Sequence, residues 1–333
     1  MRSVTPGRPH SSNGLLEQLE DRVIGQPQAM VQIVPYVEMY QASLAPEGRP
    51  AGVFLLLGPT GTGKTRTVEA LAEVLHGSAR NLLRIDCGEF QMEHEVAKLI
   101  GAPPGYLGHR ETTPMLTQQK LATVTSESSS LALVLFDEIE KAAPSMTRLL
   151  LGVLDKATLR LGDNTSVNFE RTLIFLTSNL GAREMHRELH PSFGFAAATG
   201  VPGSEAKLQA IGMNAVRRRF PPEFVNRIDC VITYRPLDAA SLTTIVDQQI
   251  ATLERHIENR LGDDAFELEV DRGAREFLLR KGTSPEYGAR ELKRAILRHL
   301  TQPLAAMVAS GEIESGALVR ASANSDSIRL QVE

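Results

Sequence analysis

Short apolar runs alternate with helical patterns through the first two thirds of the chain. Three of these runs occupy residues 53–57, 131–136 and 173–176, and residues 82–87 and 230–234 are two further strand candidates. Unbroken apolar strands with helices between them are typical of a parallel sheet that is covered on both faces. The pattern therefore predicts an α/β fold built on a parallel sheet.

Polar residues follow three of these runs at the point where each run ends. A glycine-rich turn comes after residues 53–57, Asp137 and Glu138 come after the second run, and Thr177, Ser178 and Asn179 follow the third. In open parallel sheets, ligands bind beyond the carboxyl ends of the strands. The convergence of polar groups at these ends predicts a site on one edge of the sheet.

The pattern changes near Pro236. Helical patterns follow over residues 242–261, 272–280 and 289–309, and two short alternating stretches close the chain at residues 317–321 and 327–332. We therefore expect a loose leader over residues 1–14, a large αβα domain over residues 15–236, and a smaller, mostly helical α+β domain over residues 237–333.

Composition and charge narrow the class of protein. The 333 residues exceed one typical domain of ~100–200 residues, and 42% hydrophobic with 23% charged residues is ordinary globular usage. A net charge of −4 argues against nucleic acid as the main partner. Cys87 and Cys230 form no CxxC pair, which excludes a disulfide framework and a cysteine zinc site. No apolar run approaches the ~18 residues that cross a bilayer, so we expect a soluble, cytoplasmic protein without a membrane partner.

The glycine-rich turn carries the strongest chemical signal. It matches the phosphate-binding pattern GxxxxGK[ST], and it lies between a strand and a helix as that motif requires. Its backbone N–H groups would cradle phosphate, Lys64 would reach the β- and γ-phosphates, and the Thr65 hydroxyl would ligate Mg²⁺. The predicted nucleotide-binding residues of this loop are Pro59, Thr60, Gly61, Thr62, Gly63, Lys64 and Thr65.

Two carboxylates and one amide complete the predicted site. Asp137 can hold the Mg²⁺ shell, and Glu138 can orient and polarise an attacking water. Taken alone, an Asp-Glu pair is often just a solvated acidic pair, but the upstream phosphate loop favours the nucleotide role. Asn179 could hydrogen-bond the γ-phosphate or the water, although an asparagine after a strand is often only a turn former.

With these motifs together, the chain resembles the AAA+ ATPases of the Clp type, in particular the C-terminal nucleotide-binding domain of ClpB, ClpC and ClpA. The resemblance runs from about Leu15 to the C-terminus. The segments that carry it are residues 23–26, 58–65, 99–106, 136–142, 176–181, 220–229 and 287–290.

The resemblance implies a role for each matching position. Val23 and Ile24 would line the adenine pocket, and Asn179 would be the first sensor residue. Arg227 would be the arginine finger that reaches the nucleotide of a neighbouring subunit, and Arg290, on the small lid domain, would be the second sensor. On the residues alone, both arginines are expected to form surface ion pairs. A finger acting in trans implies a ring of identical chains, usually a hexamer.

Tyr106 lies between glycines in a segment that resembles the pore loop of Clp unfoldases, which grips an extended polypeptide. An aromatic side chain on such a loop offers an apolar face that holds many sequences; the alternative is an ordinary buried tyrosine. Residues 109–113 and 155–168 depart from the family pattern. The predicted function is therefore an ATP-driven unfoldase or chaperone that threads protein, and the alternative is a dedicated remodeller of one partner complex.

Two further sequence features are weaker. Residues 193–195 (Phe-Gly-Phe) lie where peptidase-partnered relatives carry a docking tripeptide, but a loop packed on its own domain is the favoured interpretation. The run of Arg217, Arg218 and Arg219 is interpreted as a solvated or subunit-facing patch.

A DNA-acting AAA+ protein is the third functional class that we consider, and the sequence contains neither a basic domain nor a helix-turn-helix that would support it. Substrate choice is expected to come from an adaptor, the leader or the pore.

Overall fold

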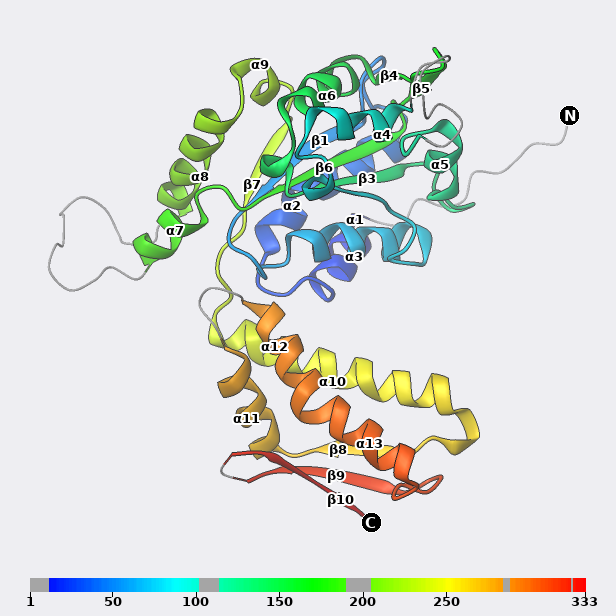
Figure 1. The fold of residues 1–333 in the computed structure, drawn as a ribbon, viewed down its shortest axis with the longest axis vertical. Helices are drawn as coiled ribbons and strands as arrows, with labels where there is room; N and C mark the ends of the chain where they lie inside the picture. Colours follow the sequence, from blue (N-terminus) through cyan, green and yellow to red (C-terminus); the bar gives the residue numbers. More distant parts are fainter. Residues whose placement is uncertain (1–11, 102–113, 190–204, 284–287, 325) are drawn as a thin grey trace, which may run out of the picture. The chain divides into compact units, whose positions relative to one another are not determined.

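The computed structural model describes residues 12–101, 114–189, 205–283, 288–324 and 326–333, and these form two compact units (Figure 1). The first unit comprises residues 1–58 and 63–234, and the second comprises residues 59–62 and 235–333. In the described residues, the first unit contains two sheets and two buried apolar clusters, and the second contains one of each, so each unit is described by itself.

The first unit is built on a five-stranded parallel sheet. Its strands are β1 (Gly52–Leu57), β2 (Leu83–Asp86), β3 (Ala132–Asp137), β6 (Thr172–Ser178) and β7 (Cys230–Thr233), in the order β2-β3-β6-β1-β7. Every neighbouring pair is parallel. The sequence prediction of a parallel-sheet α/β fold is therefore confirmed, and all five predicted strands are present.

Two apolar clusters cover the two faces of this sheet. Along β1, Val53, Leu55 and Leu57 belong to one cluster, whereas Phe54 and Leu56 belong to the other. This alternation follows from the two-residue period of a strand, and it explains why the sequence of a strand buried on both faces is continuously apolar.

Different helices pack against the two faces of the sheet, so each apolar cluster contains residues of its own group of helices. Residues of α1 (Ser12–Glu20), α2 (Pro27–Gln41) and α3 (Lys64–His76) belong to the cluster of Phe54. The cluster of Val53 contains residues of α4 (Ala97–Ile100), α5 (Gln118–Thr123), α6 (Pro144–Lys156), α8 (Glu205–Arg219) and α9 (Pro222–Val225). The described part of this unit also contains α7 (Ala182–Leu189) and short 3-10 turns at Cys87–Glu89, Glu93–Val96 and Ile139–Lys141.

A small hairpin in this unit was not predicted. Strands β4 (Thr158–Arg160) and β5 (Ser166–Asn168) pair in antiparallel fashion. Each strand has three residues, of which only the central one, Leu159 or Val167, is buried. A single buried position gives no period in the sequence, so the pattern of apolar residues could not reveal these strands.

The second unit combines helices with a three-stranded sheet. Strand β8 (Glu267–Val270) lies parallel to β9 (Leu318–Ala323), which pairs in antiparallel fashion with β10 (Ile328–Val332). The helices are α10 (Ala239–Leu261), α11 (Arg272–Gly282), α12 (Ala289–Ile296) and α13 (Gln302–Ser310). The helix expected over residues 289–309 is present, with a π-helical turn at Leu297–Thr301 between α12 and α13. Strand β8 was not predicted, although its apolar residues Leu268 and Val270 alternate with Glu267 and Glu269.

Helix α10 is 23 residues long and has one buried stripe. Leu242, Val246, Ile250 and Ile257 are its buried residues, and this spacing places them on one face. Ile245, Leu253 and Leu261 pack partly buried against the same core, and the exposed positions carry mainly polar and charged residues, as expected for a helix on the surface of a small core. None of the helices in the described residues is both long enough and apolar enough to cross a membrane.

The buried imidazole of His76, at the end of α3, predicts a pH dependence of stability. Its Nε2 donates to the carbonyl oxygen of Leu131 at 3.0 Å, its Nδ1 lies 3.0 Å from Ser126 Oγ, and burial lowers the pKa of His76. The unfolded chain, with an ordinary histidine pKa of ~6.5, then binds the proton more readily than the folded chain. This contribution to stability is present above pH ~6.5 and is lost as the pH falls toward the lower, folded pKa.

We therefore expect the free energy of unfolding to fall by up to ~1.4 kcal/mol per pH unit below pH ~6.5 through this residue. Urea unfolding curves at pH values from about 7 to about 5 measure the slope. His76→Gln should flatten it, and His94→Gln, which changes an exposed histidine of the same unit, should not. An unchanged slope in His76→Gln would contradict this account.

Candidate functional site

The glycine-rich loop follows β1 and leads directly into α3, which begins at Lys64. Gly58, Gly61 and Gly63 have φ values of 146°, 77° and 106°, in the region that favours glycine. At Gly58 an added Cβ would lie 2.6 Å from the carbonyl oxygen of Tyr234, so a side chain cannot be accommodated there without a shift. The sequence thus produces a tight turn that ends at a helix N-terminus, the arrangement in which backbone N–H groups bind anions.

Lys64 is the buried cation of the site. Its side chain folds back over the loop, where Nζ donates to the carbonyl oxygen of Gly58 at 2.7 Å and to Oδ1 of Asn179 at 2.9 Å. The residue is 8% exposed. A buried ammonium is costly unless it is hydrogen-bonded, and these acceptors hold it at the edge of the sheet.

Asp137, the last residue of β3, is fixed by hydrogen bonds to both carboxylate oxygens. Thr177 Oγ1 donates to Oδ1 at 2.5 Å, and the guanidinium of Arg84 pairs with Oδ2. Thr177 Oγ1 also accepts a hydrogen bond from the backbone N–H of Glu138 at 2.9 Å. The single hydroxyl of Thr177 therefore orients both predicted acidic residues.

Glu138 has a left-handed backbone with φ of 58°, which is uncommon for a residue with a Cβ. Its Oε1 accepts from Asn179 Nδ2 at 3.3 Å, and its Oε2 lies 2.5 Å from Lys141 Nζ. The hydrogen bond to Glu138 raises the pKa of Lys141. Strained residues of this kind cluster at functional sites, which supports a functional role for Glu138.

Asn179 connects these groups. In addition to its contacts with Lys64 and Glu138, its backbone N–H donates to Glu140 Oε1 at 3.0 Å. We call the group formed by Lys64, Asp137, Glu138, Asn179 and Thr177 the rim network. Four of these five residues were predicted as site residues from the sequence, and the structure brings those four together.

Thr177, Arg84 and Lys141 were not predicted as site residues. Thr177 lies in the polar end of β6 that follows its apolar run, and Arg84 lies in β2, where apolar and charged residues alternate. Lys141 lies three residues after Glu138, a spacing that allows contact along one turn. Their partners come from other strands in the first two cases, so local pattern gave no indication of these contacts.

Other predicted residues have varied surroundings. Val23 is buried, and its Cγ1 would lie 3.9 Å from a Cβ added to Gly63, so it lies beside the loop. Ile24 and Thr65 are half-buried. Arg227, just after α9, forms an ion pair with Asp155 at 3.2 Å.

Several predictions concern other places in the chain. Arg290 is exposed in the first turn of α12, in the second unit. Tyr106 and residues 193–195 lie outside the described residues.

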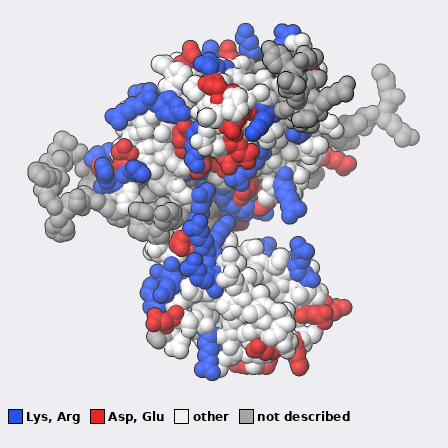
Figure 2. All heavy atoms as spheres, viewed as in Figure 1, with Lys and Arg blue, Asp and Glu red and all other residues white. Residues whose placement is uncertain are grey.

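On the face drawn in Figure 2, acidic and basic side chains are interspersed over the first unit.

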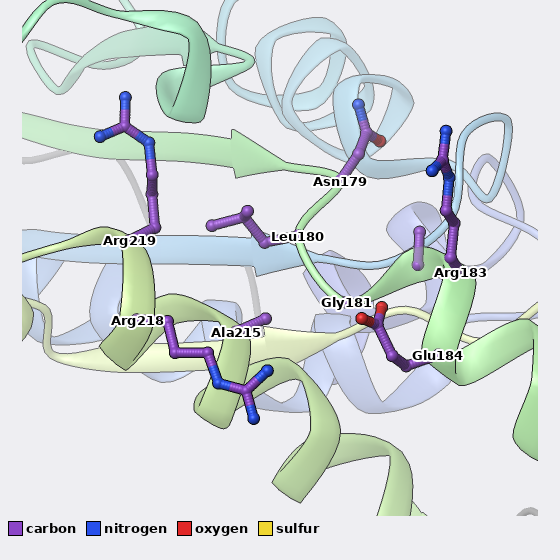
Figure 3. A pocket seen from close by; sticks show the side chains of 9 residues that line it. Asn179, Leu180, Gly181, Arg183, Glu184, Ala215, Arg218 and Arg219 are labelled. Atoms are coloured by element: carbon purple, nitrogen blue, oxygen red, sulfur yellow. The ribbon is translucent and has the colours of Figure 1, made fainter.

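A pocket of about 460 Å³ adjoins the rim network at Asn179 (Figure 3). Its lining residues are Asn179, Leu180, Gly181, Ala182, Arg183, Glu184, Ala215, Arg218 and Arg219. Arg218 and Arg219 point away from one another in this view. Arg217, Arg218 and Arg219 are all exposed, in line with a solvated patch, and the guanidinium of Arg219 in addition donates to the carbonyl oxygens of Glu140 and Ala142.

Comparison with protein families now defines the class. The model described as "AAA domain (Cdc48 subfamily)" matches residues 49–231, and the chain belongs to this family of nucleotide-binding ATPases. The model described as "C-terminal, D2-small domain, of ClpB protein" matches residues 237–321. Both matches agree with the resemblance to Clp-type AAA+ proteins, which is confirmed.

Individual relatives support the same assignment. The chain is 40% identical over 307 residues to "Chaperone protein ClpB" of Rhodopseudomonas palustris, covering 92% of this chain and 32% of that protein. It is 37% identical over 303 residues to the Meiothermus ruber protein of the same description, covering 91% and 33%. The chain therefore spans about a third of the length of the curated relatives it matches.

Solved structures agree with the fold. An Hsp104–casein complex from S. cerevisiae in an extended conformation aligns with a TM-score of 0.82 and 26% identity, covering 99% of this chain and 53% of that one. A closed state of Hsp104 with ATPγS and FITC-casein aligns with a TM-score of 0.79 and 27% identity, covering 96% and 51%.

The central position of Thr177 predicts a stability effect. Thr177→Val keeps the shape of the side chain but leaves the N–H of Glu138 and Oδ1 of Asp137 without this partner, which should cost ~1–3 kcal/mol. Thr172→Val is the matched control, because Thr172 is equally buried in β6 and its hydroxyl donates only to the carbonyl oxygen of Phe169. Urea unfolding measures both, and equal losses would contradict the proposed importance of Thr177.

Proposed function

We propose that this chain binds ATP with Mg²⁺, hydrolyses the ATP, and uses the cycle to remodel protein substrates. The observation that carries the proposal is the rim network, in which the cation of Lys64, the carboxylates of Asp137 and Glu138 and the amide of Asn179 lie within one set of hydrogen bonds. Phosphoryl transfer requires positioning and charge stabilisation rather than covalent chemistry, and these groups supply both.

The loop residues Pro59, Thr60, Gly61, Thr62 and Gly63 would hold the phosphates through their backbone. Lys64 would contact the terminal phosphates, and its hydrogen bonds to Gly58 and Asn179 would be replaced by hydrogen bonds to phosphate oxygens. Thr65 and Asp137 would hold Mg²⁺, which neutralises charge on the phosphates when bound. A magnesium ion that also binds phosphate oxygens and water needs few protein ligands, so this pair of oxygen donors fits it.

Glu138 would orient the attacking water, and Asn179 would sense the γ-phosphate. The resemblance assigns the adenine contacts to Val23 and Ile24, the arginine finger to Arg227 and the second sensor to Arg290. These assignments are predictions, as are the domain boundaries at residues 15–236 and 237–333.

The proposed substrate is protein, and the proposed assembly is a ring, usually a hexamer. The curated relatives are described as chaperones, and the Hsp104 structures contain casein. Tyr106 would contact the substrate in the pore. An adaptor, a cytoplasmic location and the absence of nucleic acid or membrane partners belong to the same proposal, and peptidase docking through residues 193–195 is not favoured. A dedicated remodeller is the second candidate because residues 109–113 differ from the family pattern.

Hydrolysis should depend on the Glu138 carboxylate. In Glu138→Gln the amide cannot accept a proton from water, so the rate of ATP hydrolysis by the full chain should fall at least ~100-fold while ATP is still bound. Glu127→Gln, at an exposed acidic residue, is the control and should hydrolyse ATP at the wild-type rate. Phosphate release in a multiple-turnover assay gives these rates. Hydrolysis by Glu138→Gln at the wild-type rate would rule out its proposed role.

Threading should depend on the aromatic ring of Tyr106. Unfolding of a tagged fluorescent protein should be lost in Tyr106→Ala and retained in Tyr106→Phe, while both variants hydrolyse ATP. Unfolding that survives in Tyr106→Ala would contradict threading. ATP hydrolysis without unfolding by the wild-type chain would instead favour the dedicated remodeller.

A further inference from the structure

Arg219, the last residue of α8, makes three hydrogen bonds to the segment that follows Glu138. Its Nε donates to the carbonyl oxygen of Glu140 at 3.1 Å, and its Nη2 donates to the carbonyl oxygens of Glu140 at 2.8 Å and of Ala142 at 3.1 Å. A planar guanidinium can donate to two carbonyl oxygens from one fixed geometry, which a lysine ammonium cannot do as rigidly. The segment and the end of α8 are therefore held together.

Glu140 links this contact to the rim network. Its backbone carbonyl accepts from Arg219, and its side-chain Oε1 accepts from the backbone N–H of Asn179 at 3.0 Å. Asn179 in turn contacts Lys64 and Glu138. Arg219 and Asn179 also line the same pocket (Figure 3). A displacement of Arg219 would thus reach the proposed water-orienting residue through two intermediate residues.

Arg219 also contacts the segment of residues 220–227, which follows it in the chain and ends at Arg227. The guanidinium of Arg219 lies 5.6 Å from the centre of the Phe220 ring, and that ring stacks on Phe224 with a centroid distance of 5.2 Å. Both rings are buried. The backbone N–H of Arg227 donates to the carbonyl oxygen of Phe224 at 3.1 Å. Packed aromatic rings resist small displacements, so this segment can move as a unit.

We propose that Arg219 is a positioning residue that couples the Arg227 segment to the rim network of the same chain. Through Arg219, the state of Arg227 at a neighbouring nucleotide would adjust the placement of Glu138 and Asn179 at the chain's own nucleotide. This inference rests on the proposed function, because it requires ATP hydrolysis and an Arg227 that acts in trans. Physical contact alone does not establish coupling, so the test is a double-mutant cycle.

The cycle compares wild type, Arg219→Ala, Arg227→Ala and the double variant in the full chain, with kcat and KM for ATP as the readouts. Arg219→Ala should lower kcat at least ~10-fold, with KM within about twofold of wild type, because geometry rather than binding is lost. In the Arg227→Ala background the same change should lower kcat less than about twofold, because the coupled segment has already lost its function.

Arg218→Ala is the matched control, since it removes a neighbouring charge that lines the pocket, and no hydrogen bond joins Arg218 to residues 139–142 within the described part of the chain. It should keep the wild-type kcat. Arg219→Lys keeps the charge and should recover only part of the kcat. If Arg219→Ala does not fold, Arg219→Lys takes its place in the cycle, and melting temperatures identify this case.

The outcomes separate the inference from the proposed function. Equal losses from Arg219→Ala in both backgrounds, a wild-type kcat in that variant, or an equal loss in Arg218→Ala would each overturn the role of Arg219 and leave ATP hydrolysis intact. An Arg227→Ala variant with wild-type hydrolysis would overturn the action of Arg227 in trans and the coupling with it. No hydrolysis by the wild-type chain would overturn the proposed function itself, together with the coupling.

Discussion

The parallel register of β1, β3 and β6 is the constraint on which the site depends. Leu57 at the end of β1 pairs with Ser178, and Phe136 in β3 pairs with Leu176, so the three strands end at nearly the same level. These strands are buried on both faces, and a slip by one residue would move polar residues into the apolar clusters. The apolar core therefore fixes the positions of the polar groups that follow the strands.

Asn179 links the polar groups at this edge of the sheet, because it forms hydrogen bonds with Lys64, Glu138 and Glu140. In a largely buried polar network each group depends on its partners, so a change at one member alters the others. Through these hydrogen bonds, binding of a nucleotide at the phosphate loop would change the position of the Glu138 side chain. Arg219 extends the same route, through Glu140, to the end of α8.

The sequence predicted the features that depend on local pattern. Long apolar runs revealed all five strands of the large sheet, and the glycine spacing revealed the loop with Lys64 at its end. The β4–β5 hairpin was missed because one buried residue per strand gives no period, whereas β8 was missed although its apolar residues alternate with glutamates. The contacts of Arg84 and Thr177 with Asp137, and of Arg219 with Glu140, join residues far apart in the chain. Such pairings depend on the strand order and on helix placement, which a local pattern does not contain.

The central claim is that the rim network and the loop form a binding site for ATP. Isothermal titration of the full chain with ATP in the presence of Mg²⁺ tests it most directly. The account predicts binding of about one ATP per chain by the wild type and by the surface control Lys207→Met, and loss of measurable binding in Lys64→Met, because the buried cation contacts the terminal phosphates. Equal binding by Lys64→Met and the wild type, or no binding by the wild type, would contradict it.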